Sequence, residues 1–437
     1  MKKITLLLLF LSLYLVGQAI VSKTVNITAG GLLSTLTTTE LSTVTNLTIA
    51  GTIDARDFVT MRDKMPVLAV LDISTVNIAA YNGNDGTFTD TLYPANTLPE
   101  YSFYNQANGQ GKTSLTTITI PSSVTSIGTG AFESSGLTSV TIPNSVTSIL
   151  QGTFYGCSSL TTITIPSSVT SIGDETFGYC SGLTSIHIPS SVTSIGTDAF
   201  AYCSGLTTIS IPSSVTSISQ STFYGCSGLT SIDIPSSVTS IGDYVFVNCK
   251  DLTSITIPSS VTSIGTDAFA YCSGLTSISI PSSVTSIRSV AFGYCSGLTS
   301  IYTYATTPVD LSLSADVFTG VNTSTCILYV PSGSLNAYQG ANQWKVFTHI
   351  VGMTNTGVSS EIINPIYLYP NPVTDGFFIK GLNGNGTLAL LDISGKMLLT
   401  KQVSGNEYVS LSTFSKGLYI VKITSAEGTI ERKLLKE

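Results

Sequence analysis

Apolar residues recur at a fixed spacing through the middle of the chain. The leucines that begin equivalent segments lie 23 residues apart, with one step of 22, at Leu115, Leu137, Leu160, Leu183, Leu206, Leu229, Leu252, Leu275 and Leu298. Each segment follows the pattern LTSIxIPSSVTSIGxxAFxxCSG. A period of about 20 to 29 residues with an LxxIxI core predicts a solenoid in which each segment forms one coil.

Within a coil, apolar and hydroxyl residues alternate with a period of two, as in the segment 163–165. This alternation predicts one short strand per coil, with isoleucine side chains buried and Thr or Ser side chains on the other face. A proline such as Pro166 follows each strand and ends its pairing, because proline has no backbone N–H. A second apolar set, which includes Val169 and Phe177, is expected to fill the coil interior.

One coil alone leaves both of its ends open, so the coils must stack into a parallel sheet with equivalent residues in columns. The fold class predicted is therefore a leucine-rich repeat solenoid of 23-residue coils with a cap at each end. One expected column contains the phenylalanines Phe132, Phe154, Phe177, Phe200, Phe223, Phe246, Phe269 and Phe292.

Seven of the eight cysteines form a second column, at Cys157, Cys180, Cys203, Cys226, Cys249, Cys272 and Cys295. An even count in an exported chain leaves a disulfide framework open. A disulfide needs converging Cβ atoms about 3.8 Å apart, whereas in-register neighbours point theirs in parallel. The first coil also has Ser135 at this position. We therefore favour buried free thiols that act as small apolar side chains.

The composition adds few charges to this picture. Only 10% of the residues are charged and the net charge is −7, so the chain lacks the cations that a nucleic-acid partner requires. The sequence contains two histidines, which disfavours acid–base catalysis. At the N-terminus, Lys2 and Lys3 precede a short apolar run and small residues, a pattern typical of a secretory signal peptide over residues 1–19.

The repeat unit resembles the BspA-type leucine-rich repeat family of bacterial cell surfaces. The flanking segments 47–74 and 93–104 resemble the family's N-terminal capping region, and 327–347 resembles its closing segment. This resemblance implies an N-terminal cap over 20–112, repeats over 113–300 and a C-terminal cap over 301–351. Serines such as Ser168 and Ser191 replace the Asn or Cys of ordinary leucine-rich repeats, so we expect a weaker side-chain ladder there.

The polar segment 352–366, bounded by Gly and Pro, is interpreted as a linker. Short alternating runs separated by turn residues then predict a small all-β sandwich over 367–437. The motifs YPNPVTDGFFI and GLYIVKI in this sandwich resemble the C-terminal sorting domain of the type IX secretion system. An ordinary carbohydrate-binding or adhesion sandwich is the alternative. The resemblance implies secretion or outer-surface localisation, the type IX machinery as a partner, and a sorting signal at Tyr369, Pro370, Asn371, Pro372, Gly417 and Tyr419.

One set of three residues contains the side-chain types of a catalytic site. His187, Ser210 and Asp233 occupy the same exposed position of consecutive strands, and they are the residue types of a catalytic triad. A triad requires the histidine between the other two, whereas here the serine is in the middle. The same column supplies two candidate metal ligands where a closed zinc site needs four. We predict no catalytic residue, metal or cofactor, and hence no enzyme.

The sheet face is the candidate ligand-binding surface, because solenoids offer extended faces of this kind. Its central column is Thr119, Thr141, Thr164, His187, Ser210, Asp233, Thr256 and Ser279, with Ser185, Ser231 and Ser254 beside it. The predicted function is binding or adhesion to an extracellular protein or glycan of a host or neighbouring cell. A passive spacer in a bacterial surface layer is the main alternative. The regular hydroxyl pairs also resemble those of ice-binding solenoids.

Overall fold

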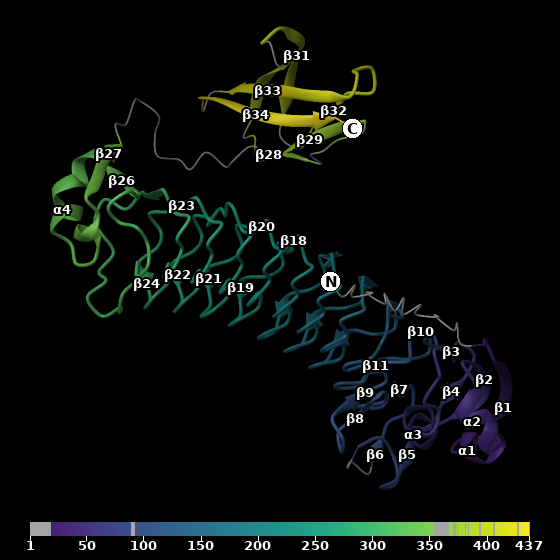
Figure 1. Ribbon diagram of the computed structural model, residues 1–437. Coiled ribbons are helices and arrows are strands. Elements are labelled where there is room, and N and C mark those ends of the chain that lie inside the picture. Colours follow the sequence, from purple (N-terminus) through teal and green to yellow (C-terminus); the bar gives the residue numbers. More distant parts are fainter. Residues whose placement is uncertain are drawn as a thin grey trace, which may run out of the picture. The chain divides into compact units, whose positions relative to one another are not determined.

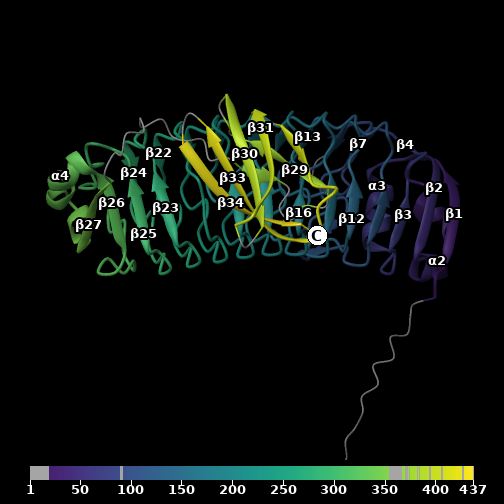
Figure 2. The same cartoon turned by 90° about the horizontal axis from the view of Figure 1, so that it is seen from above.

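A computed structural model describes residues 19–88, 92–353 and 367–436, with short gaps at 370–372, 374, 381, 383, 393–394, 405–406 and 426–427. The chain divides into two compact units, Met1–Gly352 and Met353–Glu437. The predicted signal peptide, apart from Ala19, and the predicted linker, apart from its first two residues, lie outside the described residues. In the first unit, successive coils lie side by side in a row (Figures 1 and 2).

The N-terminal part of the first unit begins the solenoid sheet before the first repeat. Three parallel strands pair in the order β1, β2, β3 and continue into the first repeat strand, β10. The strands are β1 (Ser22–Ile27), β2 (Asn46–Ile53), β3 (Val70–Asp72) and β10 (Thr117–Thr119). Three helices connect them, α1 (Leu32–Thr35), α2 (Thr38–Thr43) and α3 (Ala55–Asp63). The predicted cap therefore contains coils of its own, enlarged by helices.

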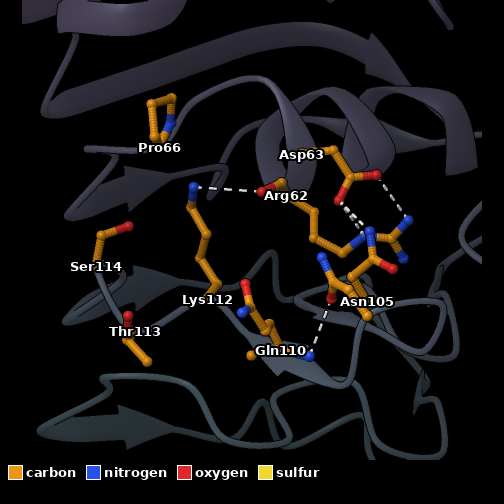
Figure 3. Close-up of a pocket in the computed structure, with 10 residues that line it drawn as sticks. Arg62, Asp63, Pro66, Asn105, Gln110, Lys112, Thr113 and Ser114 are labelled. Atoms are coloured by element: carbon orange, nitrogen blue, oxygen red, sulfur yellow. Dashed lines mark hydrogen bonds and ion pairs between the residues drawn. The ribbon is translucent and has the colours of Figure 1, made fainter.

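Short strands and hairpins complete the N-terminal part. They are β4 (Asn77–Ile78), β5 (Tyr81–Asn82), β6 (Leu92–Tyr93), β7 (Thr97–Leu98), β8 (Tyr104–Asn105) and β9 (Gln110–Gly111). Asp54 caps α3 by accepting a hydrogen bond from the backbone N–H of Arg56. Lys112, which follows β9, donates to the backbone carbonyls of Arg62 and Met65 at the other end of α3 (Figure 3). The lysine contact fixes the end of the helix against the segment that leads into the first repeat.

Most repeat coils contain two short strands. The first set forms the predicted sheet face and includes β12 (Ser139–Thr141), β14 (Thr162–Thr164), β16 (Ser185–Ile186), β18 (Thr208–Ser210), β20 (Ser231–Asp233), β23 (Ser277–Ile280) and β25 (Ser300–Thr303). The second set contains β11 (Ser126–Ile127), β13 (Ser148–Ile149), β15 (Ser171–Ile172), β17 (Ser194–Ile195), β19 (Ser217–Ile218), β21 (Ser240–Ile241), β22 (Ser263–Ile264) and β24 (Ser286–Ile287). The expectation of one strand per coil was wrong, because two-residue strands are too short to show an alternation.

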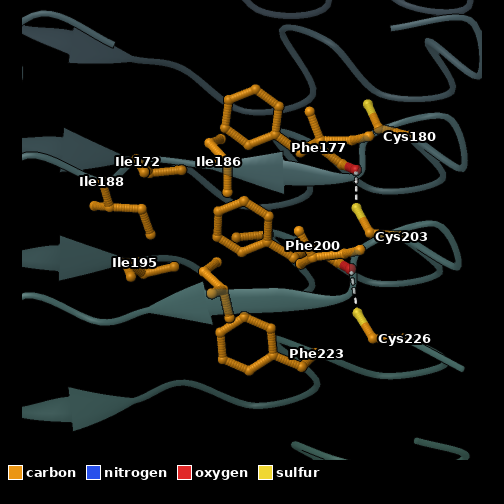
Figure 4. Packing of buried hydrophobic residues seen from close by; sticks show 14 of the residues in the cluster. Ile172, Phe177, Cys180, Ile186, Ile188, Ile195, Phe200, Cys203, Phe223 and Cys226 are labelled. Atoms are coloured by element: carbon orange, nitrogen blue, oxygen red, sulfur yellow. Dashed lines mark hydrogen bonds between the residues drawn. The ribbon is translucent and has the colours of Figure 1, made fainter. Parts of the chain in front are cut away.

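Parallel pairing in register stacks like residues on like. Ile172 pairs with Ile195, and Thr141 pairs with Thr164 in the neighbouring coil. The expected phenylalanine column is confirmed: neighbouring rings lie 5.4 and 5.7 Å from Phe200, and their planes are within 14° of its own (Figure 4). Phe103 and Phe318 extend the column into both caps. The side chains of all these phenylalanines are buried.

The C-terminal cap closes the open end of the core with large aromatic side chains. It contains β26 (Ile327–Pro331), η1 (Ser332–Ser334), α4 (Leu335–Gly340), η2 (Trp344–Val346) and β27 (His349–Met353). Trp344 and Tyr338 are fully buried, and the Trp344 indole donates to the Val309 carbonyl at 2.9 Å. Because β27 ends at Met353, the last strand extends two residues into the segment interpreted as a linker.

The second unit is the all-β sandwich expected from the sequence. One antiparallel sheet contains β28 (Tyr367–Tyr369), β29 (Gly376–Lys380) and β32 (Tyr408–Ser410). The other contains β31 (Met397–Ser404), β30 (Asn385–Asp392), β33 (Gly417–Ser425) and β34 (Gly428–Lys436). Side chains from both sheets, such as Phe377 and Val421, share one buried core.

Candidate binding face

The first strand set places the predicted contact residues on one surface. Seven of the eight side chains are exposed and Ser279 is half-buried. Six belong to the strands β10, β12, β14, β18, β20 and β23, whereas His187 directly follows β16. Thr256 lies in a coil whose first strand is reduced to a single bridge with Ser279. The flanking residues Ser185, Ser231 and Ser254 are exposed as well.

This column continues beyond the repeats in both directions. Toward the N-terminus, Thr119 pairs with Asp72, which pairs with Thr48. Toward the C-terminus, Ser279 pairs with Tyr302 and then Tyr329, whose rings stack 4.6 Å apart. The sequence signal for Tyr302 was available, since it lies 23 residues after Ser279. The other positions of the extended column could not be predicted from the repeat pattern, because the spacing changes in the caps.

The hydroxyl groups of the face column contrast with those of a neighbouring threonine column. Thr161 donates its hydroxyl to the Thr138 carbonyl of the preceding coil at 3.1 Å. The same bond, at 3.1 to 3.5 Å, is made by Thr138, Thr207, Thr230, Thr253, Thr276 and Thr299. Within the described residues, by contrast, no hydrogen bond involves the hydroxyls of Thr119, Thr141, Thr164, Ser210 and Ser279. These five hydroxyls therefore present unused donors and acceptors to solvent.

Serine and cysteine side chains form two further inter-coil ladders. Ser168 donates to the Val146 carbonyl and Ser191 to the Val169 carbonyl, both at 2.7 Å, so the serine positions do carry a hydrogen-bonded ladder. Each thiol of the cysteine column donates to the carbonyl of the preceding coil's phenylalanine at 3.0 to 3.3 Å. These bonds satisfy carbonyls inside the coils.

The structure holds all eight cysteines as buried free thiols. Burial raises the pKa of the Cys226 and Cys295 thiols to about 12, because the thiolate would lose its hydration inside the coil. Ser135 occupies the first position of the column, where its hydroxyl lies 3.3 Å from the Cys157 sulfur. The cysteine column is therefore part of the core and is shielded from the surface.

The three triad-type residues lie in the order expected from the sequence. Ser210 pairs directly with Asp233, and His187 lies on the other side of Ser210, so the histidine does not lie between the other two. Within the part of the chain that the structure describes, no group of three His, Cys, Asp or Glu side chains is placed to hold a metal ion.

A polar cavity of about 350 Å³ lies in the N-terminal part, between the end of α3 and the β8–β9 hairpin. Its charged groups already have partners. Arg62 donates to the carbonyls of Thr87 and Tyr101 and forms an ion pair with Asp63 at 2.9 Å. Burial lowers the pKa of Lys112 to about 8, and its amine is bonded to the end of α3. The charged groups of the cavity therefore hold the end of α3 against the region of the β8–β9 hairpin.

The sorting-signal residues predicted from the sequence lie in the second unit. Tyr369 ends β28 and pairs with Phe378. Gly417 begins β33, where the buried Tyr419 donates its hydroxyl to the Ser415 carbonyl at 2.6 Å. Pro370, Asn371 and Pro372 lie outside the described residues. The role of all six in sorting stays a prediction.

Comparison with solved structures finds several leucine-rich repeat proteins. The chain is 26% identical to a leucine-rich repeat protein from Bacteroides ovatus, covering 61% of this chain and 90% of that one, with a TM-score of 0.37. It is 27% identical to a leucine-rich cell surface protein from Faecalibacterium prausnitzii, covering 71% and 83%, with a TM-score of 0.37. A search of curated proteins gives no match. Among the described residues, no helix has the length and apolar character needed to cross a membrane.

Comparison with protein families assigns both units. The family described as BspA type leucine rich repeat region matches residues 96–230 and 193–325, which together exceed half of the chain. The family described as secretion system C-terminal sorting domain matches residues 367–437. Neither family is generally enzymatic. The chain therefore belongs to the BspA-type leucine-rich repeat family, and its type IX sorting domain marks it for export to the cell surface or the medium.

Proposed function

We propose that the exported chain is a binding or adhesion protein whose sheet face engages an extracellular protein or glycan of a host or neighbouring cell. One observation carries this proposal. The hydroxyls of Thr141, Thr164 and Ser210 make no hydrogen bond in the described structure, although threonines three positions earlier in the coils are bonded to the preceding coil. Unused polar groups in a regular array are available to a ligand.

The physical character of the face predicts the kind of binding. Asp233 and His187 are the only residues of the predicted column with ionisable side chains. Electrostatic steering is therefore weak, and affinity depends on many hydrogen bonds repeated along the coils. We expect slow, weak and multivalent binding that changes little with salt concentration. Tyr302 and Tyr329 add an aromatic pair at one end of the same face.

An array of matrix proteins and glycans tests the proposal directly. Residues 20–437 would be compared with a variant that combines Thr141→Ala, Thr164→Ala and Ser210→Ala. We expect the wild type to retain one or more ligands and the variant to lose them, because three adjacent hydrogen-bonding positions are removed. Absence of any wild-type ligand, or full retention by the variant, would contradict the proposal.

A passive surface spacer is the second candidate function, and the near-identity of the repeats favours it. Replacement of repeats four to six, residues 183–251, by copies of repeat eight, residues 275–297, separates the two functions. The replacement puts serine in place of His187 and Asp233, keeps a serine at the Ser210 position, and keeps the number of coils. Loss of ligand binding indicates a local site, whereas unchanged surface behaviour indicates a spacer.

A further inference from the structure

A row of tyrosines lies at the turn between the phenylalanine and cysteine columns, away from the strands of the proposed binding face. We call this row the tyrosine ridge; its members are Tyr155, Tyr179, Tyr202, Tyr224, Tyr271 and Tyr294. In four coils the tyrosine directly precedes the cysteine, and in two it lies one position earlier, followed by glycine. Each of these six coils contributes one ring, whereas the coil between Tyr224 and Tyr271 has Asn248 at this position.

The rings of consecutive coils contact one another along the ridge. Tyr179 and Tyr202 stack with centroids 4.4 Å apart and planes 17° apart. Tyr155 meets Tyr179 edge-on at 5.3 Å, and Tyr224 meets Tyr202 at 5.2 Å. Four neighbouring coils therefore share one continuous aromatic row. At about 4.8 Å per coil this row is about 14 Å long, which four or five extended residues can span.

The backbone shows that the tyrosines are not needed to close the turn. Tyr179 and Tyr202 have φ angles of 61° and 59°, in the left-handed region that disfavours residues with a Cβ atom. Gly156 and Gly225 occupy the equivalent position in other coils with φ angles of 69° and 70°. Glycine adopts this conformation without strain, so the turn itself favours glycine over tyrosine.

Packing against the neighbouring coils buries only part of each tyrosine side chain. A Cβ atom at Gly225 would lie 2.8 Å from the Tyr202 ring, so that ring does cover the next coil. Even so, Tyr179 and Tyr202 remain 44% and 40% exposed, and Tyr271 and Tyr294 are 44% and 45% exposed. Part of each of these side chains therefore stays in solvent at positions where the backbone is strained. Strain of this kind is often retained at functional sites.

Carboxylates accompany the ridge. Glu175 and Asp198 lie four residues before Tyr179 and Tyr202, in turns where the Gly178 and Ala201 N–H groups donate to their backbone carbonyls at 3.0 Å. Burial raises the pKa of Tyr155, and the neighbouring Tyr179, Glu175 and Asp198 raise it further. Neither carboxylate forms an ion pair within the described residues. The repeat region 113–300 contains eight acidic residues but only two basic ones, Lys250 and Arg288. The ridge therefore has an uncompensated negative charge.

We infer that the tyrosine ridge, together with Glu175 and Asp198, is a second interaction surface that binds an extended polypeptide segment rich in Arg and Lys. Guanidinium and ammonium groups donate hydrogen bonds to carboxylates and phenolic oxygens, and their aliphatic stems cover aromatic ring edges. Tyr and Arg are also enriched at protein interfaces. A row that spans four coils fits a chain better than a single small cation.

A peptide-binding experiment with residues 20–437 tests this inference. The probes are a fluorescent ten-residue arginine peptide and a ten-residue serine peptide of the same length. One variant combines Tyr179→Gly with Tyr202→Gly, which keeps a residue already found at this position and relieves the backbone strain. A second variant combines Glu175→Gln with Asp198→Asn. The matched control combines Asp233→Asn with Asp251→Asn, which removes the same charge from the coil 229–251, where Asn248 takes the place of a ridge tyrosine.

We expect the wild type to bind the arginine peptide and not the serine peptide. Both ridge variants should weaken binding at least tenfold with an unchanged circular dichroism spectrum, while the charge control and a Thr164→Val variant on the sheet face should not. Lack of wild-type binding, or equal weakening by the ridge and control charge variants, would overturn the inference. Should the tyrosine variant unfold, the comparison between the two charge variants decides. Because Thr164→Val alters only the sheet face, the outcome is independent of the proposed function.

Discussion

Two threonine columns of the solenoid differ in what their hydroxyl groups do, although both are exposed. In one coil, the Thr161 hydroxyl is bonded to the preceding coil at 3.1 Å, whereas the Thr164 hydroxyl, three residues later, is bonded to nothing in the described structure. Residue type and exposure are the same at both positions. What differs is the position in the coil: the N–H and the hydroxyl of Thr161, just before β14, both reach the Thr138 carbonyl, whereas Thr164 lies at the end of the strand. Exposure alone therefore does not identify a binding surface.

The largest effect on stability is expected from a substitution in the interior columns. We expect Phe200→Ala to lower the free energy of unfolding by about 3 to 5 kcal/mol, because the buried ring contacts a phenylalanine on either side and its removal leaves a cavity. Equilibrium urea denaturation measures the change. A loss below about 1 kcal/mol would show that the column does not support the coils.

The cysteine column predicts a dependence of stability on pH. The folded pKa of Cys226 is about 12, above its ordinary value of 9, so the unfolded chain releases its proton first as the pH rises. Stability from this thiol is complete below about pH 9 and falls by about 1.4 kcal/mol per pH unit between pH 9 and 12. Denaturation at pH 8, 10 and 11 should show a steeper decline for the wild type than for Cys226→Ala. Parallel curves would indicate that the thiol is not buried.

A single bond of the structural threonine column contributes less. Thr161→Val keeps the shape of the side chain but removes its hydrogen bond to the Thr138 carbonyl, so we expect a loss of about 0.5 to 1.5 kcal/mol. Urea denaturation beside the wild type is again the measurement. An unchanged midpoint and slope would mean that the inter-coil bond adds nothing to stability.

The smallest effect on stability is expected on the sheet face. Thr164→Val should change the free energy of unfolding by less than about 0.5 kcal/mol, because the hydroxyl has no partner to lose. The comparison with Thr161→Val uses the same chemical change in the same coil. A destabilisation of Thr164→Val equal to that of Thr161→Val would remove the distinction between the two columns.

Much of the solenoid could be predicted from the sequence, because the spacing of equivalent residues defines both the period and the columns. The Phe200 and Cys203 columns follow directly from the 23-residue register. The second strand of each coil was missed because a two-residue strand such as Ser171–Ile172 contains no alternation. The aromatic end of the face was missed because the spacing from Tyr302 to Tyr329 is no longer 23 residues.

The tyrosine ridge could not be predicted from the sequence for a different reason. Tyr179 and Tyr224 occupy neighbouring positions in their coils, so the tyrosines do not align in the repeat pattern, yet their rings join one row around Tyr202. Likewise, the repeat pattern places Thr161 and Thr164 at different positions of the coil but does not indicate which hydroxyl reaches a carbonyl of the preceding coil. Both features depend on distances between coils, which a repeat pattern does not contain.

The proposed difference between the face column and the structural threonine column is tested most directly by a binding measurement on two matched triple variants of residues 20–437. One removes hydroxyls from the face (Thr141→Val, Thr164→Val, Ser210→Ala), and the other removes them from the structural column (Thr161→Val, Thr207→Val, Thr230→Val). Against ligands that the wild type retains on the protein and glycan array, we predict at least a tenfold loss of affinity for the face variant. The structural variant should keep its affinity and lose stability instead. Equal affinities of the two variants, or loss in the structural variant alone, would contradict the account.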